Sequence, residues 1–279
     1  MTPPPAPSRQ SLATGFRNVD TSGDTGACHR CLDLIAGMPF FRDVKEESFR
    51  IIADTNPLRV LDAGCGVGTD LVALASRLPA GSGIVGIDAS GSLLSRAAER
   101  TKGISGRCSL VRGDLTKIPC RDDVFDACRI DRVLQHIREP EAVIRELVRV
   151  MKPGGVLVAF DNDWETFSIS LGDQEIAARI RRAWHDSFAS GSIGRDLSGI
   201  FESCGITAVR AEPRELVLTD LATAKQVFDL PDLLERMVRA GDLEPGETAV
   251  IWEELIRTAR KGGFRAGYTG YLVRGTKEG

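Results

Sequence analysis

The run VLDAGCGVGTD, residues 60–70, constrains the fold of this chain more than any other stretch. An apolar strand ends on Asp62, and a turn with three glycines separates it from a helical pattern that begins at Asp70. Glycine adopts positive φ and leaves no Cβ between backbone and ligand, while a helix N-terminus offers unpaired N–H groups. Strand, glycine turn and helix in this order predict a site for a small polar ligand on an α/β sheet.

The spacing of these glycines argues against a dinucleotide site. A nicotinamide fingerprint reads G-x-G-x-x-G, whereas here the glycines fall as G-x-G-x-G, with Asp62 two residues before the first. An acid at that place repels a pyrophosphate and attracts a cation. S-adenosylmethionine (SAM) joins an adenosine to a cationic, amino-acid-like tail, so it suits this site.

Composition excludes several other classes of protein. The 279 residues carry a net charge of −3, which disfavours a nucleic-acid partner, and no apolar run reaches the roughly 18 residues of a membrane helix. Residues 1–24 lack an apolar signal core, so we expect a flexible tail and a cytoplasmic protein. Seven cysteines, including the pair Cys28 and Cys31, are expected to be reduced structural thiols, since no second pair completes a zinc site.

Strand and helix patterns alternate along the first half of the chain. This alternation predicts a parallel sheet with helices on both faces. The second half predicts a helix over 173–190, a strand-rich segment over 206–218, two or three helices inserted over 219–262, and a last strand over 264–273. The five strands expected before them are 59–61, 84–87, 108–112, 124–130 and 156–160.

The stretch from Arg59 to Asp161, which contains the glycine turn, closely resembles class I SAM-dependent methyltransferases of the menaquinone and small-molecule branch. The matching motifs are Ile118-Pro119, Phe125-Asp126, Leu134-Gln135-His136, Glu146 to Val150 and Lys152-Pro153-Gly154-Gly155. A looser likeness continues through Asp163 to Thr166, Gly194 to Leu197, and Gly263 to Arg265. The resemblance implies a Rossmann-like, seven-stranded α/β sheet whose last strand is antiparallel. It further implies one domain over 25–279, with a core of about 55–163 and helical cap segments of about 164–193 and 219–262.

The resemblance also assigns the cofactor site. Asp88 lies 20 residues after Gly68, at a strand end where an acid can accept both ribose hydroxyls, although it could instead cap the next helix. The N-terminal residues Phe16, Arg17 and Asp20 are candidates to close over the cofactor. The implied contacts are Asp62, Gly64 and Gly66 to the methionine moiety, Asp88 with Ala89 to the ribose, Asp114 with Leu115 to the adenine, and Ile130 with Asp131 beside the methionine tail.

For catalysis, His136 is the candidate base, because it follows strand four on the ligand edge of the sheet and its imidazole suits proton transfer. Its alternative is a packed or capping residue in the first turn of a helix. Asp161 and Asp163 follow strand five on the same edge, where they can orient His136 or act as bases. Asp131 with Asp161-Asn162 also matches a catechol-type magnesium site, but the surrounding motifs belong to the metal-free branch, so we expect no metal.

The sequence therefore predicts transfer of a methyl group from SAM to a small-molecule acceptor, and we expect this to be a step of secondary metabolism. Oxygen is the first choice of acceptor atom, with nitrogen and carbon close behind. The rival hypothesis is a cyclase or binding module that keeps the SAM site without methyl transfer, because the fold does not fix the reaction. An RNA or protein substrate is disfavoured, and a homodimer stays open. Trp164, Phe167, Trp184 and Phe188 line a substrate pocket or pack in the core.

Overall fold

The computed structural model describes residues 15–16, 19–21 and 25–279, without the side chains of residues 25 and 27–30. Arg17 and the side chain of Cys28 therefore lie outside the described part of the chain. The six described cysteine side chains are free thiols. Among the described residues, no helix has the length and apolarity that crossing a membrane requires.

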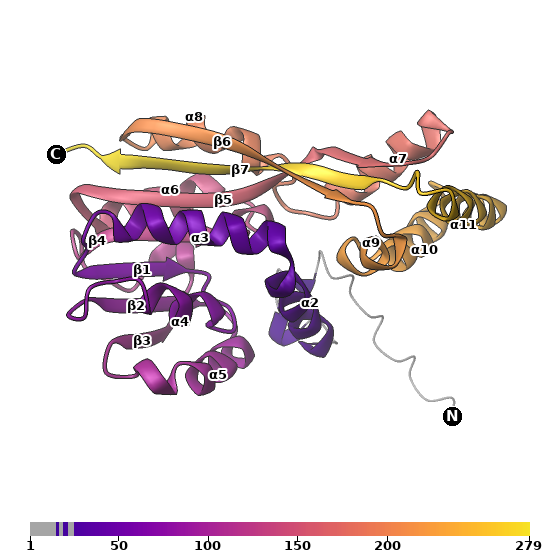
Figure 1. The fold of residues 1–279 in the computed structure, drawn as a ribbon. Helices are drawn as coiled ribbons and strands as arrows, with labels where there is room; N and C mark the ends of the chain where they lie inside the picture. Colours follow the sequence, from indigo (N-terminus) through magenta and orange to yellow (C-terminus); the bar gives the residue numbers. More distant parts are fainter. Residues whose placement is uncertain (1–14, 17–18, 22–24) are drawn as a thin grey trace, which may run out of the picture.

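A seven-stranded sheet organises the molecule, in the order β3-β2-β1-β4-β5-β7-β6 (Figure 1). Strands β1 to β5 run parallel, and β7 is antiparallel to both of its neighbours. The predicted sheet with an antiparallel last strand is thus confirmed. The strands are β1 (Arg59–Ala63), β2 (Gly83–Asp88), β3 (Cys108–Arg112), β4 (Phe125–Asp131), β5 (Met151–Ile169), β6 (Ile206–Leu218) and β7 (Ala266–Lys277).

Helices cover both faces of the sheet because successive strand side chains point to opposite faces. Val60 and Val158 pack in the core under α3 (Pro39–Ala53) and α4 (Thr69–Ala75). Their neighbours Leu61 and Leu157 pack in the opposite core. That core includes the apolar faces of α6 (Pro140–Val150) and α8 (Ile193–Ser203), while α5 (Gly91–Arg100) contacts β2 and β3.

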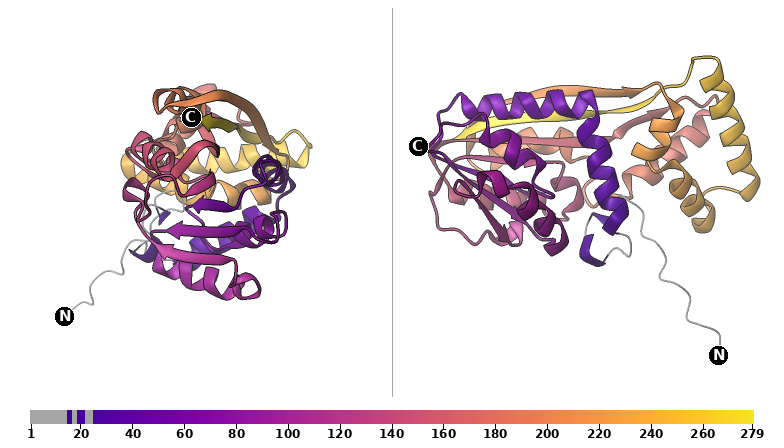
Figure 2. Two further views of the ribbon diagram at one scale, coloured as in Figure 1. Left: turned by 90° about the vertical axis from the view of Figure 1, so that its left-hand side faces the viewer. Right: turned by 60° about the horizontal axis from the view of Figure 1, so that its bottom comes forward.

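Strands β5 to β7 project beyond the rest of the sheet and carry a helical cap at their far end (Figures 1 and 2). The predicted fifth strand, 156–160, is too short, because pairing with β7 resumes at Ser168 and Gly267 after a register shift. Residues 164–169, expected in the cap, are therefore part of β5. The cap consists of α7 (Gln174–His185), which ends five residues earlier than predicted, and of α9 (Leu221–Val227), α10 (Leu230–Ala240) and α11 (Pro245–Arg260).

The N-terminal part lies between the sheet and the cap. It contains the short 3-10 helix η1 (Val19–Thr21) and the helix α2 (Thr25–Gly37), which contacts η1, α3 and α9. Val19 is buried, so residues 19–21 depart from the flexible tail predicted for 1–24. The remaining 3-10 turns are η2 (Lys102–Ile104), η3 (Leu115–Lys117) and η4 (Leu134–His136).

Candidate functional site

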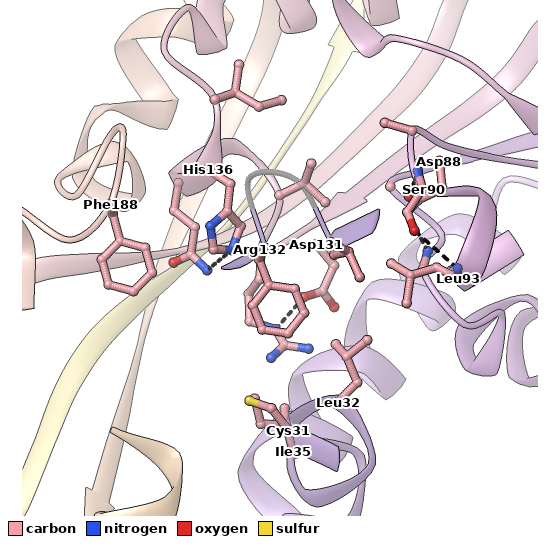
Figure 3. Close-up of a pocket in the computed structure, with 18 of the residues that line it drawn as sticks. Cys31, Leu32, Ile35, Asp88, Ser90, Leu93, Asp131, Arg132, His136 and Phe188 are labelled. Atoms are coloured by element: carbon pink, nitrogen blue, oxygen red, sulfur yellow. Dashed lines mark hydrogen bonds and ion pairs between the residues drawn. The ribbon is translucent and has the colours of Figure 1, made fainter. Parts of the chain in front are cut away.

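A cavity of about 540 Å³ lies at the carboxyl ends of β1, β2 and β4, under α2 (Figure 3). Its volume is that of a typical ligand pocket, and parallel α/β sheets bind ligands at this edge. Eight residues predicted for the site line it: Gly64, Gly66, Asp88, Ala89, Asp114, Leu115, Asp131 and His136. Four others do not: Asp62, Ile130, Asp161 and Asp163.

The glycine turn has two functions, divided between two of its residues. Gly64 has φ of +74°, and a Cβ there would meet the side chain of Val133 at 2.3 Å, so packing requires this glycine. Gly66 has φ of +52°, but a Cβ there would meet nothing within 4 Å. Gly66 is therefore the position where the backbone faces open space that a ligand can occupy.

Asp88 lies at the end of β2, and both of its carboxylate oxygens accept backbone hydrogen bonds. Its Oδ2 accepts a hydrogen bond from the backbone N–H of Gly66 at 2.9 Å, and its Oδ1 accepts one from that of Ser90 at 2.9 Å. Burial raises the pKa of Asp88 above its usual value. Each carboxylate oxygen has a further lone pair, so ribose hydroxyls can still donate to Asp88 from the cavity.

The predicted adenine corner is formed by Asp114 and Leu115. Asp114 accepts hydrogen bonds from the backbone N–H and the hydroxyl of Thr116, both at 2.8 Å, and so caps η3. Leu115 is buried and contributes apolar surface to the cavity. The corner therefore offers both a carboxylate and an apolar wall, as an adenine ring requires.

Asp20 fastens the N-terminal segment to this end of the cavity. Its carboxylate accepts hydrogen bonds from the Ser90 hydroxyl at 2.6 Å and the Gly91 backbone N–H at 2.8 Å. The Ser90 and Ser92 hydroxyls hold the pKa of Asp20 well below its usual range. Val19 and Phe16 line the cavity beside it, so two of the three candidate closing residues, Phe16 and Asp20, are at the site.

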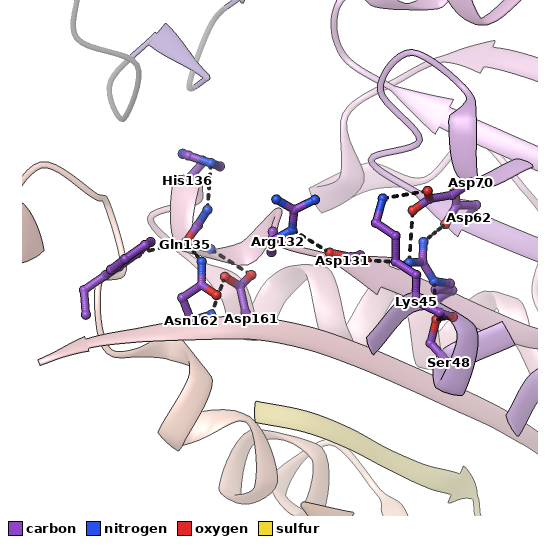
Figure 4. A network of polar contacts seen from close by, with 12 residues as sticks. Lys45, Ser48, Asp62, Asp70, Asp131, Arg132, Gln135, His136, Asp161 and Asn162 are labelled. Carbon is purple, nitrogen blue, oxygen red and sulfur yellow. Dashed lines mark hydrogen bonds and ion pairs between the residues drawn. The ribbon is translucent and has the colours of Figure 1, made fainter. Parts of the chain in front are cut away.

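Asp62 belongs to a buried ionic cluster that we name the Arg129 cluster: Lys45, Asp62, Asp70, Arg129, Asp131 and Arg132 (Figure 4). Arg129 is 2% exposed and pairs with Asp62 at 2.9 Å, Asp70 at 3.0 Å and Asp131 at 2.5 Å. The direct contact that we predicted between Asp62 and the methionine moiety does not fit this position. Asp62 instead fixes Arg129 behind the glycine turn.

At the other end of the cavity, the side chain of Gln135 links Trp164, Asn162 and His136. Trp164 Nε1 and Asn162 Nδ2 donate to its Oε1 at 2.9 and 3.0 Å, and its Nε2 lies 3.1 Å from Nε2 of His136. An indole N–H can only donate, so the oxygen must face Trp164 and the amide NH₂ must face His136. His136 Nε2 is therefore the acceptor, and a neutral His136 carries its proton on Nδ1.

Aromatic rings surround this end of the cavity. Trp164 stacks on Phe188 at 4.8 Å and 13°, and Trp184 packs edge-on against Trp164 at 5.5 Å. The His136 ring lies 5.6 Å from both Phe188 and Phe16. Trp164, Trp184 and Phe188 line the cavity, as the first of the two predicted alternatives, a pocket lining, requires. Phe167 does not line it, and packs in the core.

Asp161 and Asp163 lie behind this wall, outside the cavity lining. Asp161 is fully buried and accepts hydrogen bonds from the backbone N–H groups of Gln135 at 3.2 Å and Asn162 at 2.9 Å. Asp163 pairs with Arg195 at 2.6 Å. Neither carboxylate reaches His136, so a direct catalytic role for them does not fit their positions; Asp161 supports Gln135 instead.

The magnesium site considered as an alternative does not fit either, because its carboxylate oxygens already accept hydrogen bonds from protein groups. The two oxygens of Asp131 accept from Arg129 and Arg132, and those of Asp161 accept from backbone N–H groups. Across the described residues, no group of three or more His, Cys, Asp or Glu side chains is arranged to hold a metal ion.

Among the cavity-lining residues that sequence reasoning missed, Arg132 and Gln135 bear most on the chemistry of the site. Arg132 follows β4 directly, and Gln135 lies three residues later, within the Leu134-Gln135-His136 motif that was used only to locate His136. Their position in that segment was the available signal, because the first residues after a parallel strand lie on the ligand edge.

Comparisons with known proteins place the chain among methyltransferases. The model of a methyltransferase domain family matches residues 54–192. An uncharacterised 37.1 kDa protein in transposon TN4556 of Streptomyces fradiae is 34% identical over 214 residues, which cover 76% of this chain and 61% of that protein. A demethylmenaquinone methyltransferase of Clavibacter sepedonicus is 38% identical over 109 residues, 39% of this chain and 43% of that protein. The chain thus spans less than two thirds of these curated relatives.

The solved structure of the [4+2]-cyclase SpnF has a TM-score of 0.56 at 18% identity, and the match covers 99% of this chain and 98% of that one. This likeness concerns the fold alone. The open backbone at Gly66, the acceptor oxygens of Asp88 and the corner at Asp114 fit the adenosine and tail of SAM. The chain belongs to the class I SAM-dependent methyltransferases.

Proposed function

We propose that this protein transfers a methyl group from SAM to a small-molecule acceptor that has a flat, largely apolar body. One observation carries the proposal: a single cavity joins the polar end at Gly66 and Asp88 to the aromatic end at Trp164, Trp184 and Phe188. A cofactor held at the first end points its reactive tail toward a ligand held at the second.

The chemistry asks little of the protein beyond positioning. Bound SAM supplies a methyl group on a sulfonium, which is already a strong electrophile. The chain's own residues hold the cofactor at Asp88 and close the cavity with α2 and Phe16. They also align the acceptor between aromatic rings, and alignment with exclusion of water can supply on the order of 7 kcal/mol.

We put oxygen first as the acceptor atom, with nitrogen and carbon as alternatives. The imidazole of His136 lines the cavity, and a hydroxyl nucleophile gains more from a nearby proton acceptor than a neutral amine does. In the observed geometry His136 Nε2 already accepts from Gln135, so taking a proton there requires Gln135 to move. The base role of His136 therefore stays a prediction.

Turnover tests the proposal. The protein is incubated with methyl-labelled SAM and a panel of phenols, catechols, aromatic amines and activated carbon acids, and S-adenosylhomocysteine (SAH) formation is measured. We expect release of SAH that depends on a phenolic acceptor. Tight SAM binding without turnover over the whole panel would favour a cyclase or binding module, a rival that the shared fold of SpnF keeps in view.

A further inference from the structure

Arg132 occupies an unusual backbone position directly after β4. Its φ is +54°, in the left-handed region that costs a non-glycine residue about 1–2 kcal/mol. Its backbone N–H donates to the carbonyl of Phe160 at 2.7 Å, which holds it at the junction of β4 and β5. Strained residues of this kind concentrate at ligand sites, because the surrounding structure must fix the side chain.

The guanidinium of Arg132 is anchored on one side. Nε donates to Asp131 Oδ1 at 2.9 Å, and the group lies 4.5 Å from the ring centre of Phe41. Asp131 is the side-chain acceptor of Arg132 among the residues that the structure describes, and its other oxygen accepts from Arg129. The terminal N–H groups of Arg132 therefore remain available to the cavity that the residue lines.

A planar fork of terminal N–H donors matches a carboxylate in two parallel hydrogen bonds. The side chain of Arg132 is only 12% exposed, and in such a setting charge-assisted hydrogen bonds are stronger than in water. Asp131 is shared with Arg129, so it does not serve Arg132 alone. A carboxylate on a ligand would complete the set of acceptors around Arg132.

Figure 3 shows how Arg132 lies in the cavity. Arg132 is at the centre of the cavity, between Asp88 at one end and His136 with Phe188 at the other, and it faces α2 at Leu32. Any ligand that spans the two ends passes its guanidinium. We propose that Arg132 is the carboxylate-binding residue of this cavity. The carboxylate belongs to the amino-acid tail of the cofactor or to the acceptor, and the cofactor identity rests on the proposed function.

Binding calorimetry on the full chain tests this without methyl transfer. SAH carries the amino-acid carboxylate, whereas 5′-methylthioadenosine has the same nucleoside without it. We expect Arg132→Met to weaken the binding of SAH by roughly 10- to 100-fold, which is the value of charge-assisted hydrogen bonds. The affinity for methylthioadenosine should stay unchanged. Arg132→Lys, which keeps the charge without the fork, should fall between the two.

Arg112→Met is the matched control, because Arg112 lines the same cavity beside Ala89 and donates to its carbonyl at 3.0 Å. That change should alter the affinities for SAH and for methylthioadenosine by the same factor. If Arg132→Met leaves SAH binding unchanged but abolishes binding of benzoate to the SAH complex, the carboxylate is the acceptor's and the proposal still holds. Equal factors for SAH and methylthioadenosine, with benzoate unaffected, would overturn it. Selective SAH binding without turnover would refute only the proposed function.

Discussion

Gln135 donates to Nε2 of His136 at 3.1 Å, and this contact determines which proton a neutral His136 carries. The orientation of the amide is not free, because Trp164 Nε1 donates to its oxygen at 2.9 Å and an indole cannot accept. Asp161 holds the backbone N–H of Gln135 from behind. The position of the proton on a neutral His136 is thus fixed by hydrogen bonds that lead from Asp161 and Trp164 in β5 through Gln135.

Gln135→Glu should move the proton of His136. A carboxylate keeps both acceptor contacts with Trp164 and Asn162, but it must receive a proton from His136 Nε2 rather than donate to it. Nitrogen-15 NMR of the imidazole should therefore report the Nδ1–H form in the wild type and an Nε2-protonated ring in the variant. Gln135→Met, which neither donates nor accepts through an amide, should give a mixture. Identical spectra for all three proteins would refute the assignment.

Gly64→Ala and Gly66→Ala should have different effects, although both residues have positive φ. At Gly64 the new Cβ meets Val133 at 2.3 Å, so strain and overlap together should lower the free energy of unfolding by about 2–4 kcal/mol. At Gly66 the space is open, so only the backbone cost of about 1–2 kcal/mol applies, and SAH binding should weaken through loss of ligand space. Urea unfolding and calorimetry on both variants separate the two effects. Weak binding with full stability in Gly64→Ala would contradict this division.

The order of strands and the ligand edge could be predicted because both depend on local patterns. Apolar runs ending on Asp62 and Asp88, each followed by a helix start, specify parallel strands and the edge at which a ligand binds. The length of β5 could not be predicted this way. Its extension to Ile169 depends on pairing with β7, about a hundred residues later, and no local pattern encodes that pairing.

The roles of individual acids were harder to predict for the same reason. Asp62 and Asp131 stand at adjacent strand ends, and sequence alone treats both as cofactor residues. Arg129, which points inward from the middle of β4 and is 2% exposed, captures them both. A buried arginine in a strand has no sequence signature that distinguishes it from a surface one, so the Arg129 cluster becomes visible only in three dimensions.

The ion pair between Asp163 and Arg195 should respond asymmetrically to substitution. Asp163 is 1% exposed and Arg195 is 45% exposed, so removing the arginine strands a buried carboxylate whereas removing the acid leaves a cation that water can solvate. Arg195→Met should lower the free energy of unfolding by on the order of 3 kcal/mol, and Asp163→Asn by clearly less.

Urea titrations of both single variants and of the double variant measure this asymmetry. The double variant should recover much of the loss seen in Arg195→Met, because no charge is then left buried. Equal losses in the two single variants would show that the pair acts as a surface contact.

Asp161 should make the protein less stable as the pH rises. Burial raises its pKa from 3.8 to about 7, so between these values the native state keeps a proton that the unfolded chain has released. The contribution of Asp161 to the free energy of unfolding is complete below pH 3.8 and is lost as the pH rises through about 7. Between pH 5 and 8 this loss amounts to roughly 2–3 kcal/mol. Asp161→Asn cannot ionise, so its free energy of unfolding should fall less over that interval, even if the variant is weaker at every pH because an amide replaces one carboxylate acceptor. Urea unfolding of both proteins at pH 5 and 8 gives the comparison, and parallel pH dependence in the two would show that Asp161 does not titrate there.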